Sequence, residues 1–172
     1  MAKDIRTSTP LSTLTDLKPE EVSKVADAVN PLIADAFAVY VKTKNFHWHL
    51  SGSHFRDYHL LLDEQADTIF ASIDVLAERM RKIGATSIRS IGHISKLQTV
   101  EDNDDEFVAP ADMIKILLAD NDTMARNMRA AIEVCDDNRD SPTGNILQDL
   151  LDQTERRKWF LFEIAQGAEN AT

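Results

Sequence analysis

The sequence predicts an all-α protein built from four long helices and one short one. Between residues 56 and 84 the apolar residues recur at alternating steps of four and three, which is the spacing of helices that pack lengthwise against one another. No run of about 18 apolar residues indicates a membrane span, and 43% hydrophobic content is enough for a core. The 172 residues suit a single domain, expected over residues 18–168.

A polar tail is expected over residues 1–17, followed by a helix from Pro19 to His49. The pair Asn30-Pro31 leaves two alternatives inside this segment. Either Asn30 caps a fresh helix with Pro31 at its first position, or Pro31 kinks one continuous helix.

The turn at residues 51–53 separates this segment from a second helix over residues 56–84, which contains no Pro and no internal Gly. One face of that helix carries the repeating apolar residues Leu62, Ala66, Ile69, Ile73, Leu76, Met80 and Ile83. Such a stripe predicts packing against a neighbouring helix.

The rest of the chain predicts a short helix over residues 92–97 and a solvated acidic loop over residues 101–106. Two long helices follow, over residues 110–135 and 142–168, each opened by a Pro. A short C-terminal tail, 169–172, completes the chain.

Five residues able to bind metals lie on the first two predicted helices: His47, His59, Asp63, Asp74 and Glu78. At about 100° per residue, and with His59 as zero, the three carboxylates lie near 40°, 60° and 100°. Four of the five therefore share one stripe beside the apolar stripe of the second helix.

Height along the helix separates these four residues into two pairs. A rise of about 1.5 Å per residue puts the centre of the His59–Asp63 pair about 22 Å from that of the Asp74–Glu78 pair. One metal cannot contact both pairs, but an antiparallel copy of the same helix would bring them together across a two-fold axis. The spacing therefore predicts two equivalent sites per dimer.

His47 joins the first pair because an antiparallel hairpin brings it to the height of His59. Imidazole and carboxylate donors without thiolate suit iron, with manganese and zinc as competitors. Taken singly, each residue has a simpler explanation: the carboxylates as solvated charges and His59 as a hydrogen-bonded histidine. Their shared stripe and the hairpin favour the metal site.

Three neighbouring aromatic residues have plainer interpretations. Trp48 is either a core aromatic or an indole that intercepts oxidising equivalents beside a ligand. His49 points about 200° away from His47, and His54 lies in the turn, so both are expected at the surface.

Several motifs resemble the Dps family of mini-ferritins, and the resemblance covers nearly all of the chain. They are Asn45-Phe46-His47-Trp48, Ser51-Gly52-Ser53-His54-Phe55, Tyr58-His59 with Asp63, and Asp74 with Ala77-Glu78-Arg79 and Ile83-Gly84. The resemblance implies a ferritin-like four-helix bundle with a short extra helix between the second and third helices. It further implies a hollow dodecamer that oxidises Fe(II), preferably with hydrogen peroxide, and stores ferric oxide.

The family's ferroxidase ligands map onto the five residues named above, and its neighbouring tryptophan maps onto Trp48. We hypothesise that Asp63 and Glu78 bridge or share the metals, that the two imidazoles anchor them, and that Asp74 ligates more weakly. No histidine here has Glu three residues before it, so the Glu-x-x-His signature of a di-iron centre within one bundle is absent.

The resemblance implies two further features of the later helices. Glu155 is expected to pair with Arg79, the residue after the ligand Glu78. Asp136, Asp137 and Asp140 are expected to line a three-fold pore that draws cations inward; the alternative is a solvated helix end.

Charge bears on partners. A net charge of −10 disfavours binding to the phosphates of DNA. The N-terminal tail adds no net positive charge, because Asp4 and Asp16 balance Lys3 and Arg6. The single Cys135 excludes an intrachain disulfide and is expected to act as a small apolar residue. The five candidate ligands and the resemblance favour a ferroxidase, expected in the cytoplasm, with a DNA-compacting nucleoid protein and a catalytically silent helical assembly as the rivals.

Overall fold

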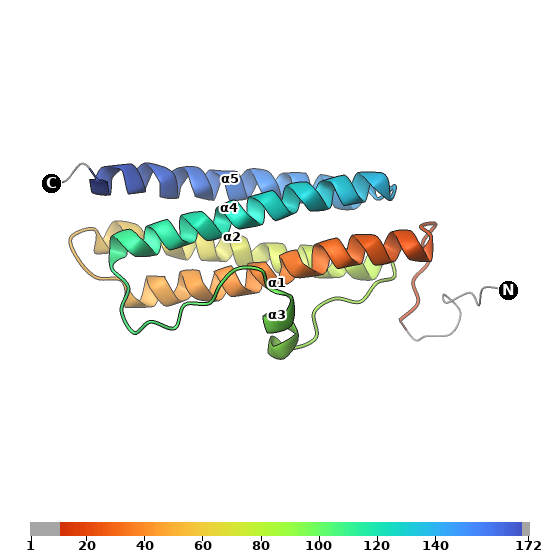
Figure 1. The fold of residues 1–172 in the computed structure, drawn as a ribbon, viewed down its shortest axis with the longest axis horizontal. Coiled ribbons are helices and arrows are strands. Elements are labelled where there is room, and N and C mark those ends of the chain that lie inside the picture. The colour runs from red at the N-terminus through yellow and green to blue at the C-terminus, as the bar shows by residue number, and fades with distance from the viewer. Residues whose placement is uncertain (1–10, 170–172) are drawn as a thin grey trace.

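The computed structural model describes residues 11–169, and within them it contains helices and no strand. Their bounds are α1 Pro19–His49, α2 Phe55–Lys82, α3 Ile91–Leu97, α4 Pro110–Asp137 and α5 Ser141–Glu169. The four long helices form an elongated bundle, with α3 lying outside it against α1 (Figure 1). The expected four-helix bundle with a short extra helix is confirmed.

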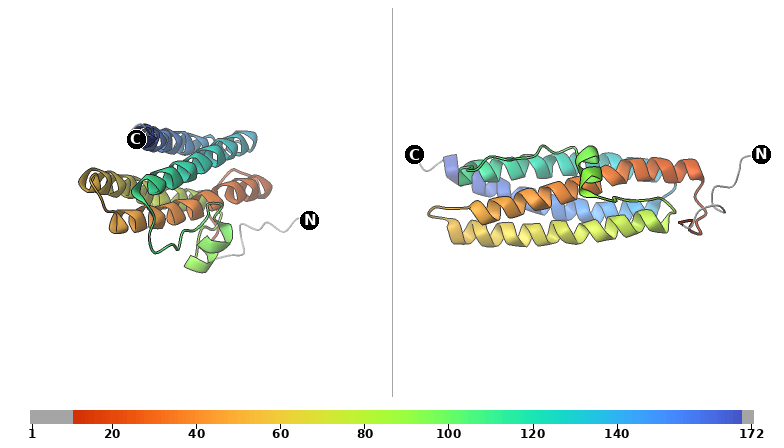
Figure 2. Two further views of the ribbon diagram at one scale, coloured as in Figure 1. Left: turned by 60° about the vertical axis from the view of Figure 1, so that its left-hand side comes forward. Right: turned by 90° about the horizontal axis from the view of Figure 1, so that it is seen from below.

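Two antiparallel hairpins, α1–α2 and α4–α5, make up the bundle (Figure 2). The connection that carries α3 returns from one end of the bundle to the other, so that α2 and α4 run parallel (Figure 1). Such a long crossover is characteristic of ferritin-like bundles. It also leaves the outer face of the α1–α2 hairpin covered only in part, by α3.

Helix α1 is one continuous helix that contains Pro31, so the fresh-helix alternative at Asn30 is wrong. Pro31 removes one backbone donor, and the helix tolerates this loss within its 31 residues. At its start, Pro19 occupies the first turn and the Lys18 amide donates to the Glu21 carboxylate at 2.7 Å. The helix ends before Gly52, whose φ of 102° suits the tight turn into α2.

All seven residues of the apolar stripe expected for the second helix are buried. The last residues of the expected N-terminal tail also pack on this helix. Leu17 is buried in the core, Thr13 donates to the Arg81 carbonyl, and Arg81 donates to the Leu11 carbonyl. The described part of that tail is therefore attached to the bundle.

Buried Asp35 on α1 holds the start of the connection between α3 and α4. Its carboxylate accepts hydrogen bonds from the Thr99 amide at 2.5 Å, the Thr99 hydroxyl at 2.8 Å and the Val100 amide at 3.2 Å. Because three donors satisfy it, the carboxylate is tolerated in the core. It also fixes the position of α3 beside α1.

A polar layer crosses the middle of the bundle and divides its hydrophobic core into two clusters. On each long helix, buried polar residues lie between the residues of one cluster and those of the other. The layer consists of Lys42, Thr43, Gln65, Asp120, Asn121, Thr154 and Arg157. Every long helix contributes at least one of them.

Candidate metal centre

The α1–α2 turn brings His47 and His59 together in a reciprocal arrangement. His47 Nδ1 lies 2.8 Å from the His59 carbonyl oxygen, and His59 Nδ1 lies 3.0 Å from the His47 carbonyl oxygen. The two rings stack with their centroids 3.7 Å apart and an interplanar angle of 18°. Because a carbonyl only accepts, both Nδ1 atoms carry the proton.

This pairing leaves the Nε2 lone pair of each imidazole available for a metal. Metal-binding histidines generally donate their other ring N–H to a carbonyl or carboxylate, which fixes the tautomer and orients the ring. Phe55 stacks on His59 from the start of α2, with 4.9 Å between the ring centroids. Contacts within one subunit are therefore enough to orient both imidazoles so that they could bind a metal.

Asp63 lies beside His47 and next to a lysine of α1. Its Oδ1 lies 3.8 Å from His47 Nε2 and 2.5 Å from the ammonium of Lys44. The hydrogen bond from Lys44 lowers the pKa of Asp63, and the same contact raises the pKa of Lys44. Asp63 is thus held as a carboxylate. The ammonium of Lys44 lies beside this carboxylate, where a metal ion would bind.

Lys44 was not identified from the sequence. It lies three residues before His47, on the same face of α1, and this spacing was the available signal.

Asp74 and Glu78 lie further along α2, away from the histidine pair. Glu78 is exposed and pairs with Lys82, 3.6 Å away on the same helix. Since α2 is continuous over Phe55–Lys82, the separation of about 22 Å between the two pairs holds. Among the side chains that the structure describes, no three of His, Cys, Asp or Glu are grouped to hold a metal.

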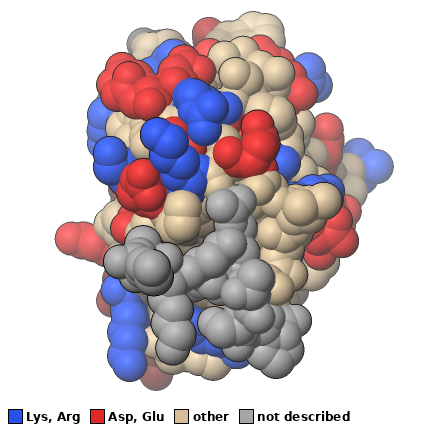
Figure 3. Space-filling view, turned by 90° about the vertical axis from the view of Figure 1, so that its right-hand side faces the viewer, with Lys and Arg blue, Asp and Glu red and all other residues tan. Residues whose placement is uncertain are grey.

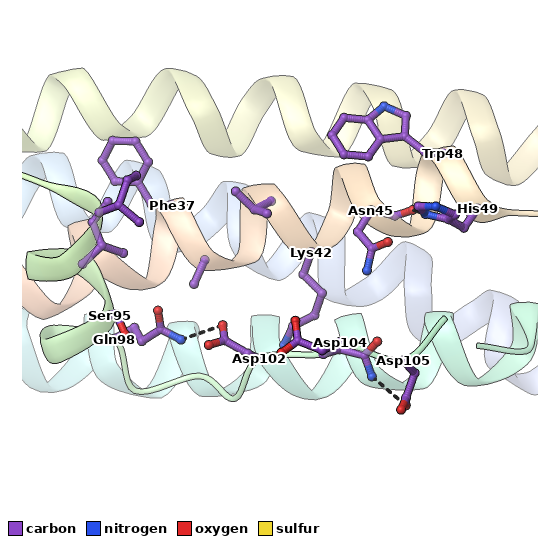
Figure 4. A pocket seen from close by; sticks show the side chains of 15 residues that line it. Phe37, Lys42, Asn45, Trp48, His49, Ser95, Gln98, Asp102, Asp104 and Asp105 are labelled. Atoms are coloured by element: carbon purple, nitrogen blue, oxygen red, sulfur yellow. Dashed lines mark hydrogen bonds between the residues drawn. The ribbon is translucent and has the colours of Figure 1, made fainter. Parts of the chain in front are cut away.

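Trp48 is 63% exposed, so it is not a core aromatic of the subunit, and that alternative is wrong. It lies at one end of a pocket between α1, α3 and the acidic segment before α4, with Phe37 at the other end (Figure 4). His49 and His54 are exposed, as expected.

A family model for the ferritin-like domain matches residues 26–170, which is most of the chain. The chain belongs to the ferritin-like family. Among curated proteins it is 29% identical to an uncharacterized low temperature-induced protein of Nostoc, over 88% of this chain and 85% of that one. It is 26% identical to DNA protection during starvation protein 1 of Deinococcus radiodurans, over 86% of this chain and 72% of that one.

Solved structures agree with these relatives. Dps from Thermosynechococcus elongatus is 27% identical, with a TM-score of 0.82, and the match covers 84% of this chain and 92% of that one. Together these matches place this ferritin-like chain among the Dps proteins, which confirms the resemblance expected from its motifs.

The interior of this Dps bundle differs from a ferritin-like di-iron centre. Such centres gather Glu and His side chains at the middle of the bundle. Here that level is the polar layer, with Lys42 and Arg157 against one carboxylate, Asp120. Lys42 contacts Asp120 at 2.8 Å, so within the layer the charge of Arg157 has no carboxylate of its own. This charge opposes a divalent cation inside the subunit.

The expected pair of Glu155 with Arg79 is wrong. Arg79 donates to the Asp140 carboxylate and, at 2.8 Å, to the Thr143 hydroxyl, whereas Glu155 pairs with Arg129 on α4. Glu155 lies near the middle of α5, but Arg79 lies near the end of α2, where the α4–α5 turn is its neighbour. Position along the bundle decides the partner.

This pairing also corrects one expected pore residue. Asp140 is 1% exposed and accepts from Arg79 and Thr143, so its carboxylate stabilises the turn within the subunit. Asp136 and Asp137 are exposed and remain candidates for a pore. Figure 3 views this end of the bundle, where acidic and basic side chains are interspersed.

The remaining expectations have separate outcomes. Cys135 is buried, and burial raises the pKa of its thiol to about 12, in keeping with an apolar role.

The prediction about DNA binding rests on Lys3, Arg6 and residues 170–172, which lie outside the described residues. Across the described helices, none is both long enough and apolar enough to cross a bilayer.

Proposed function

We propose that this Dps protein is a ferroxidase that oxidises Fe(II) with hydrogen peroxide at sites shared by two subunits, and stores the ferric product. The observation that carries the proposal is the reciprocal pairing of His47 and His59, which presents two Nε2 lone pairs beside Asp63. An antiparallel partner would add its own Asp74 and Glu78. The site would then hold two imidazoles and three carboxylates, a donor set suited to iron.

The surface around these residues supports an isologous partner. Large apolar side chains of α1, α2 and α3 are exposed on the face that the crossover leaves uncovered: Val41 (56%), Trp48 (63%), Phe70 (54%) and Ile91 (79%). Exposed apolar surface of this kind typically marks an interaction site. Asp74 lines a pocket on the same face with Phe70 and Ile91, so a partner seated there would reach the carboxylates.

A second apolar surface supports an assembly larger than a dimer. Trp159 and Phe162 of α5 are exposed beside Leu118 of α4, on a different hairpin from the first surface. A two-fold contact uses one surface twice, so a separate surface is free to form a heterologous contact that closes into a ring. The closed particle proposed here is the dodecamer, with its cavity as the iron store.

In the proposed reaction, two Fe(II) ions each lose one electron to one hydrogen peroxide. The O–O bond breaks and the two oxygens leave as hydroxide, so no hydroxyl radical is released. The carboxylates favour electron loss because they stabilise Fe(III) more than Fe(II). Removal of peroxide and ferrous iron would protect DNA without contact.

Stopped-flow measurement of Fe(II) oxidation by peroxide tests the proposal. The double variant Asp74→Ala/Glu78→Ala should lose most of its rate, whereas the control Asp149→Ala/Asp152→Ala, which removes two exposed carboxylates from α5, should not. Undiminished oxidation by the first variant would refute the site. DNA retardation by the wild-type protein at moderate salt would instead favour the DNA-compacting rival.

A further inference from the structure

Arg157 is a buried cation without an anionic partner. It is 7% exposed, and its guanidinium contacts only neutral groups: the Asn121 amide oxygen at 2.9 Å, the Thr154 hydroxyl at 2.7 Å and the Thr68 hydroxyl at 3.4 Å. Among residues 11–166, whose side chains the structure describes, no carboxylate lies within ion-pair distance of it. Buried charges in proteins are generally paired, because transferring a bare ion from water is costly.

The neighbouring groups add donors rather than acceptors. Gln65 is 5% exposed, and its side-chain nitrogen has no hydrogen-bond partner. Gln65 and Thr68 are three residues apart on α2 and so share one face, the face that Arg157 reaches. The Thr68 hydroxyl already donates to the Gln65 carbonyl at 2.9 Å. This part of the polar layer is therefore rich in donors and poor in acceptors.

The least satisfied nitrogen of Arg157 is Nη1, whose one contact is the long bond to Thr68. Thr68 is an exposed residue, so that end of the guanidinium lies just below the surface between α2 and α5. A small ion would have a short path to it. A water molecule would satisfy the donors there but would leave the charge uncompensated.

We propose that Arg157 and Gln65 form a binding site for a small monovalent anion of halide size. Asp120 does not compete for this role because Lys42 binds it on the α1 side of the layer. The anion would neutralise the buried Arg157 guanidinium and stabilise the bundle. The proposal is independent of iron oxidation, since it concerns the interior of one subunit.

Crystals of the full-length protein grown in sodium bromide test this directly. An anomalous difference map at the bromine edge should show a peak in contact with the Arg157 guanidinium and the Gln65 amide. A map without bromide there, in crystals grown at high bromide concentration, would overturn the proposal.

Thermal unfolding provides the solution test, with sodium bromide compared with sodium gluconate at equal ionic strength. At about five times the dissociation constant, bromide should raise the Tm of the wild type by roughly 2–4 °C. Arg157→Gln should abolish this difference, whereas Arg156→Gln, the exposed neighbour, should retain it. If Arg157→Gln does not fold, Gln65→Met should reduce the difference. Equal Tm values for the wild type in the two salts would count against the site.

Discussion

His47 and His59 donate their Nδ1 protons to each other's backbone carbonyls, at 2.8 and 3.0 Å, while their rings stack. The acceptors are backbone atoms, so each imidazole keeps its own hydrogen bond when the other ring is removed. The two imidazoles are therefore independent in orientation although they are in contact. This independence makes single substitutions informative.

Replacing either imidazole should remove one metal anchor and leave the other. We expect His59→Ala to lower the rate of Fe(II) oxidation by at least about tenfold, since even outer-shell partners of a metal typically contribute 10- to 100-fold. His49→Ala is the matched control, because His49 also lies 2.9 Å from a backbone carbonyl, that of Asn45, but is exposed. Equal losses in both variants would indicate a structural effect.

A site divided between two subunits predicts complementation between inactive chains. One chain carries His47→Ala/His59→Ala and the other carries Asp74→Ala/Glu78→Ala. Each mixed dimer should contain one intact site and one doubly defective site. Random reassembly of equal amounts should therefore restore about a quarter of the wild-type sites. No recovery in reassembled particles would argue against sharing.

Lys44 should compete with the metal for Asp63, because its ammonium lies 2.5 Å from the carboxylate. Lys44→Met keeps the length of the side chain and removes the charge. We expect it to tighten Co(II) binding by about twofold to fivefold, as measured by calorimetry, in line with the small effect of exposed ion pairs. Lys24→Met, at an exposed position, should leave the affinity unchanged; weaker binding by Lys44→Met would show that the lysine supports the site.

Glu21 and Arg139 predict a pH dependence of stability. The side-chain hydrogen bond from Arg139 lowers the pKa of Glu21 from 4.5 to about 2. Because the folded pKa is the lower one, the contribution is fully present above pH 4.5 and is lost as the pH falls toward 2. Glu21→Gln should reduce the change of the denaturation midpoint with pH over this window, and Glu20→Gln should leave that change as it is in the wild type. An unaltered profile for Glu21→Gln would contradict the assignment.

Asp140 and its exposed neighbours should behave differently. Asp140→Ala leaves Arg79 and the Thr143 hydroxyl without their carboxylate, so urea denaturation should show a loss of about 3–5 kcal/mol. Asp136→Asn/Asp137→Asn should preserve stability and slow iron uptake, if these residues line a pore. Unchanged uptake by the double variant would remove the pore assignment.

The sequence alone determined the helices, the buried stripe of α2 and the separation of the two pairs of candidate ligands. Helical periodicity and rise are local properties, and therefore the spacing of His59, Asp63, Asp74 and Glu78 already implied their separation. The α1–α2 turn is also local, which is why the approach of His47 to His59 was predictable.

Only the tertiary structure decided which distant side chains meet. Arg79 pairs with Asp140 rather than Glu155 because the ends of α2 and α4 coincide along the bundle. Likewise, Arg157 is buried without a carboxylate because all four long helices place their polar residues at the same level. Such contacts depend on how helices are aligned relative to one another, and periodicity within a single helix does not determine that alignment.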